Sequence, residues 1–437
     1  MRTVYIHAAI AALIVFSMAT LGAQEVVNQP LTMQQAVDLA LKYNPMIAGA
    51  QAMSDAADAR VAMTKAMNRP VLSASVGATT ATMSMIFNTP PNVMPSANLM
   101  FPGDNSTNGQ LMLMAPLYTG GRLSSQIRAS QHALVAATSD RDGVTLDVIL
   151  GVKLAYLDCL LAKSETDVYQ KYVSEEEERV RIAEAALAEG KIAKYDLLRN
   201  QADLARAQQQ LIAAQRDLAV AVINLRAAIG INQDSDIALA DTLASPATDN
   251  RTAGELTEYA RSHRPDVAAT AARVAAARAT KDVAKSAYRP QLYLNAAQGF
   301  TSVSGGENES GYSVGVVAGI PILDGGLRHA AVREAEAEMS AVLKDEEKVT
   351  LTIQQEVRVA MADVDAAAKR ASLSDAAVSQ AEEDYRVIKL RYEAGKAINV
   401  EVLDALAILV EAQTARLAAI YDENAARVKL ARAIGDR

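Results

Sequence analysis

The chain has 437 residues, of which 50% are hydrophobic, 22% charged and 4% aromatic, and this composition excludes a disordered polymer and a collagen-like fibre. The formal net charge of -8 argues against nucleic-acid binding, because neutralising phosphates needs a basic face. A single cysteine, Cys159, permits neither an internal disulfide nor a thiolate metal cluster.

Residues 1–23 have the pattern of a secretory signal peptide. Arg2 supplies a positive charge, Ala8 to Phe16 is an apolar core, and Leu21 to Ala23 ends in small residues suitable for cleavage before Gln24. No later segment reaches the roughly 18 consecutive apolar residues that a membrane-spanning helix needs. We therefore expect an exported protein of a bacterial periplasm or outer membrane; a buried N-terminal helix is the alternative.

The remaining chain contains an internal duplication, with a first repeat at 24–245 and a second at 246–437. Segment 44–70 matches 264–290 at a constant offset of 220 residues, the difference between Pro45 and Pro265. Later positions match at an offset of 205 residues: Pro116, Gly120, Gly121, Gly190 and Gly230 correspond to Pro321, Gly325, Gly326, Gly395 and Gly435. An insertion rich in Met, Asn and Pro, Met83 to Gly109, accounts for the difference between the two offsets.

The same order of elements is expected in both repeats. The first has a helix at 46–69, a hairpin at 71–118, a long helix at 122–189 and a helix at 192–229. In the second, a helix at 266–289 stops at Pro290, a hairpin follows at 291–320, and helices are expected at 327–394 and 397–434. The hairpin assignment rests on alternation, with Leu292, Leu294 and Ala296 on one strand face.

The long helix at 327–394 contains no proline or glycine and would be roughly 100 Å long. Its apolar and small residues are spaced alternately by three and four, which is the spacing of a coiled-coil seam. Alanine and serine dominate this seam and would allow close approach of helices, as an extended tube wall needs. The seam residues are Val364, Ala367, Ala371, Ser374, Val378, Ala381, Tyr385, Ile388 and Tyr392.

The expected fold is mainly α with a small β part, built from duplicated long helical hairpins and four strands per chain. Two hairpins leave open sheet edges, which are stable neither in lipid nor in water. The strands must therefore close with other chains. Because membrane barrels start at about 8 strands, a dimer is the minimum and a trimer would give a twelve-stranded barrel.

Several motifs in this order resemble the TolC family of outer-membrane efflux and secretion channels. They are the Arg-Pro exits at Arg69 and Arg289, the Pro-x-x-x-Gly-Gly junctions that begin at Pro116 and Pro321, and the run from Tyr392 to Ala405. The resemblance covers nearly the whole mature chain. It implies a homotrimer in outer-membrane lipid, a coiled-coil periplasmic tunnel, a periplasmic adaptor protein and an inner-membrane pump of the RND or ABC type.

Catalytic and cofactor motifs are missing from the sequence. His132, His263 and His329 lie in helical patterns without a paired nucleophile and carboxylate, so we expect neither an enzyme nor a cofactor. Six methionines between residues 83 and 114 could bind Cu(I) through their thioethers, but flexible apolar filler is the plainer interpretation. They are Met83, Met85, Met94, Met100, Met112 and Met114.

The strongest site candidates lie at the far helical turns. Gly190 and Gly395 interrupt continuous helical patterns, where a left-handed residue lets the chain reverse. With Lys191 and Lys396 they mark the turns at which the resemblance implies adaptor docking.

Glu401 and Asp404 lie three residues apart on one helix face, so symmetry would form a ring of carboxylates that attracts cations. The resemblance matches these positions to the acidic constriction of TolC-like channels, although acids in a first helical turn also simply complement the helix dipole. At the same register the first repeat has Asp196 and Arg199. Asp196 and Tyr392 fall on positions that resemble a gating link, whereas Ala397 stands where the best-known member has a linking arginine.

The leading functional hypothesis is therefore a passive channel that completes a tripartite efflux system for small molecules. A duct of a type I protein secretion system uses the same architecture, and the sequence does not separate the two. A periplasmic coiled-coil scaffold without a pore is a third hypothesis, which the alternating hairpins disfavour.

Overall fold

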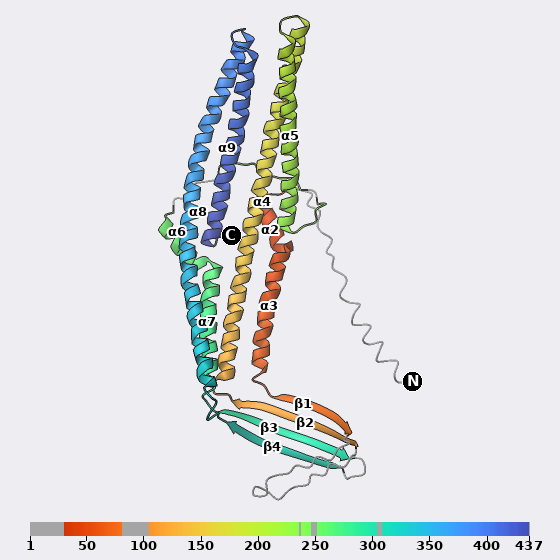
Figure 1. The fold of residues 1–437 in the computed structure, drawn as a ribbon, viewed down its shortest axis with the longest axis vertical. Helices are drawn as coiled ribbons and strands as arrows, with labels where there is room; N and C mark the ends of the chain where they lie inside the picture. The colour runs from red at the N-terminus through yellow and green to blue at the C-terminus, as the bar shows by residue number, and fades with distance from the viewer. Residues whose placement is uncertain (1–29, 81–104, 236, 246–250, 304–307, 437) are drawn as a thin grey trace, which may run out of the picture. The chain divides into compact units, whose positions relative to one another are not determined.

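The computed structural model describes residues 30–80, 105–235, 237–245, 251–303 and 308–436. The expected signal peptide and most of the insertion, including Met83, Met85, Met94 and Met100, lie outside the described residues. The element order occurs twice (Figure 1). The first series is α2 (Met33–Tyr43), α3 (Pro45–Ala66), β1 (Val71–Thr80), β2 (Asn105–Tyr118), α4 (Arg122–Ala188) and α5 (Lys194–Ile229). The second is α6 (Ala253–His263), α7 (Pro265–Ser286), β3 (Gln291–Val303), β4 (Glu309–Gly319), α8 (Leu327–Glu393) and α9 (Asn399–Ile434).

Sequence analysis does not predict α2 and α6, the short helices that precede α3 and α7. Each begins with a capping box that the sequence does carry. The Thr32 hydroxyl accepts from the Gln35 N–H while the Gln35 side chain accepts from the Thr32 N–H, and Thr252 and Glu255 make the same pair of bonds.

The ends of several helices differ from the expected bounds by a few residues. α7 ends at Ser286 rather than 289, because the N–H groups of Tyr288 and Arg289 turn back to the carbonyls of Lys285 and Ser286 before Pro290. α5 and α9 begin at Lys194 and Asn399, two residues later than 192 and 397, since the turns after Gly190 and Gly395 extend into those positions.

The chain divides into two compact units that do not coincide with the repeats. Unit 1 comprises the residues up to Ala48, Thr145–Leu256 and Glu356–Arg437, and unit 2 comprises Gly49–Val144 and Thr257–Gln355. Each unit therefore contains parts of both repeats, and the helices α4 and α8 contribute to both.

Unit 2 contains one four-stranded antiparallel sheet with the order β1-β2-β3-β4. Directly opposed residues share a face of such a sheet, so the registers define the composition of each face. One face is mainly apolar along all four strands, as the alternation in β3 predicts, with Gln298 opposite Leu111 as a polar exception. It carries Leu72, Ala74, Val76, Leu111, Leu113, Ala115, Leu292, Leu294, Ala296, Val314, Val316 and Ala318.

The opposite face of the sheet is more polar. Ser73 faces Met112, Ser75 faces Gln110, and Asn295 lies between Met114 and Gly315. Met112 and Met114, the two described members of the methionine group, thus lie on this mixed face. Much of the apolar face is uncovered, since Leu72, Val76 and Val314 are 69%, 78% and 71% exposed.

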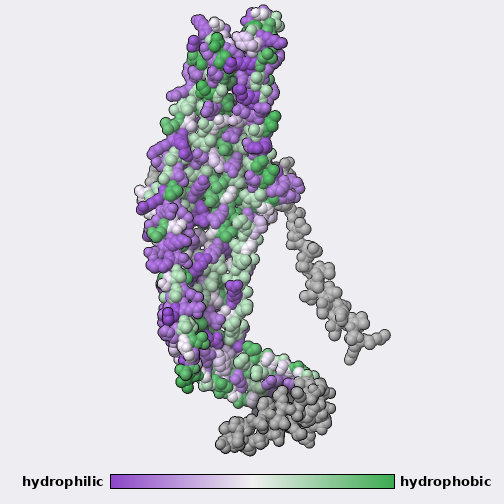
Figure 2. All heavy atoms as spheres, in the orientation of Figure 1, coloured by the Kyte–Doolittle hydropathy of each residue, from purple (hydrophilic) through white to green (hydrophobic). Residues whose placement is uncertain are grey.

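Unit 1 is held by helix packing around buried residues of both repeats. Tyr156 on α4 is fully buried, and its hydroxyl lies 2.7 Å from the Leu31 carbonyl oxygen and 2.9 Å from Asp241 Oδ2. Hydrophilic and hydrophobic residues are interspersed on the outside of the helices (Figure 2). None of the described helices is long and apolar enough to cross a membrane.

Candidate functional site at the helical hairpin turns

The two far helical turns have nearly identical backbones. Gly190 and Gly395 adopt φ values of 72° and 70°, a left-handed conformation that disfavours a side chain. The following lysine N–H groups bond back into the preceding helix, Lys191 to the Ala186 carbonyl and Lys396 to the Arg391 carbonyl. These bonds satisfy carbonyls at the helix end, so both turns are closed by the same backbone chemistry.

The side chains at the turns are solvent-accessible. Lys191 and Lys396 are exposed, as are Gly190 and Gly395. Lys191 forms an ion pair with Glu189 across the first turn. Exposed backbone and lysine side chains at both turns are therefore available to a partner.

The acidic candidates lie on the first turns of α5 and α9. Glu401 and Asp404 are exposed, whereas Val402 and Leu403 between them are buried. This arrangement places both carboxylates on the solvent face of α9, as the three-residue spacing predicts. Asp196 is half-buried on α5.

The structure does not join Asp196 to Tyr392. Among the described residues, no hydrogen bond links these side chains, although both are half-buried near the turns. The gating link therefore stays a prediction. Polar bonds between the two helical hairpins do occur, but they involve residues that the sequence does not mark as site candidates.

One such connection near the turns is a chain of side chains across three helices. Arg179 on α4 donates from Nη2 to Asn399 Oδ1 on α9 at 2.9 Å. Asn399 in turn donates from Nδ2 to Asn200 Oδ1 on α5 at 2.7 Å. These bonds connect the α4–α5 hairpin of the first repeat to the first residue of α9.

Glu176 lies one helical turn before Arg179 and is fully buried. Its nearest cation is Arg179, whose Nε lies 3.6 Å from Glu176 Oε2. Neither carboxylate oxygen has a hydrogen-bond partner among the described residues. Burial raises the pKa of Glu176 to about 7, and the Arg179 guanidinium opposes that rise. A carboxyl group that titrates near neutral pH is thus built into the helix packing.

A second bond joins the hairpins beside Glu176. The Tyr385 hydroxyl on α8 donates to Glu175 Oε2 on α4 at 3.1 Å, and Lys389 Nζ lies 3.5 Å from the same oxygen. Burial and the Glu175 charge raise the pKa of Tyr385 to about 12. Apolar residues of α4, α5 and α9 pack next to Tyr385: Tyr172, Val173, Ala207, Leu406 and Val410.

The sequence pattern does not reveal this polar layer. Glu176 belongs to the run Glu175 to Glu178, which has the composition of a solvated helix face. Only the packing of the neighbouring helices distinguishes buried Glu176 from exposed Glu177 and Glu178. The Arg179 spacing of three residues indicates an ion pair, but not that the pair is buried.

Comparison with known proteins identifies the family of the chain. The family model described as "Outer membrane efflux protein" matches residues 36–231 and 256–436, almost all of the described chain. The chain belongs to the outer membrane efflux protein family. Membership confirms the resemblance to TolC-like channels and the predicted outer-membrane location.

Individual relatives are distant but match over much of their length. The chain is 26% identical over 328 residues to the pyoverdine export outer membrane protein OpmQ of Pseudomonas aeruginosa, covering 73% of this chain and 67% of the relative. It is 24% identical over 321 residues to the toluene efflux pump outer membrane protein TtgF of Pseudomonas putida, covering 72% and 66%.

A solved structure of the outer-membrane channel OprN matches the fold with a TM-score of 0.78 at 23% identity. It covers 93% of this chain and 90% of that chain. The expected mainly helical fold with a small antiparallel β part is confirmed. Members of this efflux protein family are channel proteins rather than enzymes.

Proposed function

We propose that the chain is one subunit of a homotrimeric channel that passively conducts small molecules from an inner-membrane pump and a periplasmic adaptor to the cell exterior. The observation that carries this proposal is the two-faced sheet of unit 2. An exposed apolar face suits lipid, and the mixed face with Ser73, Ser75 and Asn295 suits an aqueous bore.

The sheet also favours assembly over a scaffold without a pore. β1 and β4 are its outer strands, each paired on one side only among the described residues. Unpaired strand edges are unstable in lipid, and closure with further copies of the chain removes them. Three copies would supply twelve strands, within the range of known barrels.

The turns of unit 1 support the remaining parts of the proposal. Symmetry would arrange Glu401, Asp404 and Asp196 around the narrow end of the bore, where they favour cations. The exposed turns at Gly190–Lys191 and Gly395–Lys396 provide the adaptor site. Because the similar proteins OpmQ and TtgF are named for pyoverdine export and toluene efflux, small molecules are the favoured substrates over secreted polypeptides.

Matched lysine substitutions in β1 test the sheet assignment. Val76→Lys places a charge on the apolar face, whereas Ser75→Lys places it one residue away on the mixed face. On the lipid side a lysine costs roughly 2–4 kcal/mol at the bilayer midplane. We expect Val76→Lys to reduce the amount of assembled protein in the outer membrane and Ser75→Lys to leave it near wild type. Equal amounts of the two variants would remove the lipid-facing assignment.

Site-directed photo-crosslinking in cells tests the adaptor site. A crosslinker at Lys191 or Lys396 should capture one periplasmic protein, which mass spectrometry identifies. The control position is Lys344 on α8, which is exposed but remote in sequence from both turns. Capture of the same protein from Lys344 alone would refute docking at the turns.

A further inference from the structure

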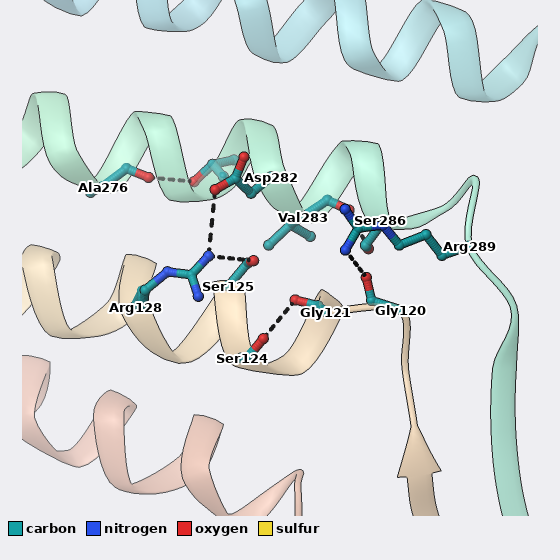
Figure 3. Close-up of polar contacts among 11 residues, drawn as sticks. Gly120, Gly121, Ser124, Ser125, Arg128, Ala276, Asp282, Val283, Ser286 and Arg289 are labelled. Carbon is teal, nitrogen blue, oxygen red and sulfur yellow. Dashed lines mark hydrogen bonds and ion pairs between the residues drawn. The ribbon is translucent and has the colours of Figure 1, made fainter.

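The strand-to-helix junction of the first repeat is covered by a residue of the second repeat. Figure 3 shows the Arg289 guanidinium donating from Nη1 to the Gly120 carbonyl oxygen, at 3.2 Å. Gly120 is buried, and a Cβ atom there would lie 2.7 Å from Arg289 Cβ and 3.0 Å from the Ser286 carbonyl oxygen. The Gly120 junction thus fits closely against the chain that leaves α7.

The second repeat has the same backbone junction, with polar contacts from its own Asp324 and Arg328, but among the described residues none bonds to the Gly325 carbonyl oxygen. Gly325 has a φ of 62°, identical to that of Gly120, and the φ values of Gly326 and Gly121 are 91° and 88°. Yet Gly325 is exposed, and a Cβ atom there would meet nothing within 4 Å. The neighbouring Ile322 and Leu323 are each 92% exposed. One backbone geometry is therefore covered in the first repeat and open in the second.

The chain also contains an arginine that could cover the open Gly325 junction. Arg69 occupies the register of Arg289, at the 220-residue offset of the duplication. The two arginines leave equivalent turns, with the Arg69 N–H bonded to the Ala66 carbonyl at 2.9 Å and the Arg289 N–H to the Ser286 carbonyl at 3.0 Å. Among the residues that the structure describes, none forms a hydrogen bond or ion pair with the Arg69 side chain.

Arg69 and the Gly325 junction cannot meet within one chain. Arg69 precedes β1 and Gly325 follows β4, and these strands are the opposite edges of the sheet. In a second copy whose β1 paired with β4 of the first, Arg69 would lie at the same end of the sheet as Gly325.

We propose that the Arg69 guanidinium of one subunit binds the Gly325 carbonyl oxygen of the next, repeating at each subunit interface the Arg289–Gly120 bond within the chain. The inference rests on the proposed oligomeric channel and places Arg69 at the interface between neighbouring subunits. Such a bond is charge-assisted and stronger than a neutral one.

If the interface between subunits repeats the pairing of β2 with β3 within the chain, the register of β4 against β1 of the next subunit follows. Leu113 on β2 faces Ala296 on β3. Applying the two offsets, Ala318 on β4 faces Val76 on β1 of the next subunit. Val317, one residue earlier, points to the opposite sheet face, because side chains alternate along a strand.

Oxidative crosslinking tests this register. In a variant without the native cysteine (Cys159→Ala), the pair Val76→Cys with Ala318→Cys should form disulfide-linked oligomers on denaturing gels. The pair Val76→Cys with Val317→Cys is the register control and should not. The pair Leu113→Cys with Ala296→Cys, which links a chain to itself, reports that oxidation has worked. Crosslinking of the control pair in place of the Ala318 pair would overturn the inferred register.

Subunit dissociation tests the arginine itself. Arg69→Ala should make the purified oligomer dissociate about tenfold faster in denaturing detergent, the expected loss for a charge-assisted bond. Arg60→Ala, at an exposed arginine on α3, the helix that precedes Arg69, is the control and should behave like wild type. Equal rates for Arg69→Ala and wild type would overturn the arginine contact while an intact conducting oligomer leaves the proposed channel standing. A monomeric, non-conducting wild type would instead refute the channel.

Discussion

The two repeats share their backbone but differ in the chemistry of their long helices. Gly190 and Gly395 close equivalent turns with φ values of 72° and 70°. At the 205-residue offset, buried Glu176 of α4 is replaced by Ala381 of α8, and Arg179 by exposed Asp384. Proline and glycine positions thus specify a backbone shape that the chain uses twice, whereas the buried Glu176–Arg179 pair of α4 has no counterpart at the matched positions of α8. The two repeats of each subunit are therefore similar in backbone conformation at the turns but different in the charge that their long helices carry.

Removing the cation of the buried pair should give the largest difference between the repeats. Arg179→Ala leaves Glu176 buried without its only ion-pair partner in the described chain and should cost about 3 kcal/mol of unfolding free energy at pH 8. Asp384→Ala at the matched position of α8 should change it by less than about 0.5 kcal/mol. Thermal or chemical unfolding followed by circular dichroism measures both. Equal losses would show that the polar layer contributes no stability of its own.

The charge of Glu176 should make stability depend on pH. Because burial raises the pKa of this carboxyl from 4.5 to about 7, the folded state binds a proton more tightly than the unfolded state. Its contribution to stability is therefore complete below about pH 4.5 and is lost as the pH rises through 7. The shift corresponds to roughly 3 kcal/mol.

Glu176→Gln should remove this loss and flatten the dependence of the unfolding midpoint between pH 5 and pH 8. Burial is the main cause of the raised pKa of Glu176; the neighbouring charges that modify this pKa are Arg179, which lowers it, and Asp203 and Glu175, which raise it. Glu177→Gln is the matched control, since Glu177 is exposed and is not one of these groups. A Glu176→Gln protein with the wild-type pH dependence would contradict a buried, titrating Glu176.

A smaller difference in the loss of unfolding free energy is expected at another matched pair of residues. Tyr156 on α4 corresponds to Met361 on α8 at the same offset. Tyr156→Phe removes the hydroxyl that contacts Leu31 and Asp241, which should cost about 1–3 kcal/mol because these buried groups lose a partner. Met361→Leu keeps volume and should cost less than about 1.5 kcal/mol. A larger loss for Met361→Leu, measured by the same unfolding assay, would reverse this comparison.

The smallest effects concern conduction at the turns. If Asp196 and Tyr392 hold the aperture, then Asp196→Ala or Tyr392→Phe should raise single-channel conductance in planar bilayers, by about twofold. Glu401→Gln at the matching position of the second repeat should instead weaken cation preference without opening the aperture. Unchanged conductance in both Asp196→Ala and Tyr392→Phe would remove the gating role.

The sequence predicts those features that depend on local rules. Pro290 and the glycine turns mark the helix ends to within a few residues, and the alternation of Leu292, Leu294 and Ala296 places these residues on one face. The buried layer could not be predicted, because a run of four glutamates is normally solvated and its burial depends on helices more than 200 residues away, as with Tyr385 and Glu175. The open Gly325 junction could not be predicted either, because only the structure shows that Gly120 is covered and Gly325 is not.

Several copies of this chain are proposed to close one continuous wall around a bore. Native mass spectrometry of the protein extracted from the outer membrane in mild detergent tests this assembly most directly, with bilayer conductance measured on the same preparation. We expect a species of three chains that conducts ions. A single-chain species without conductance would contradict it.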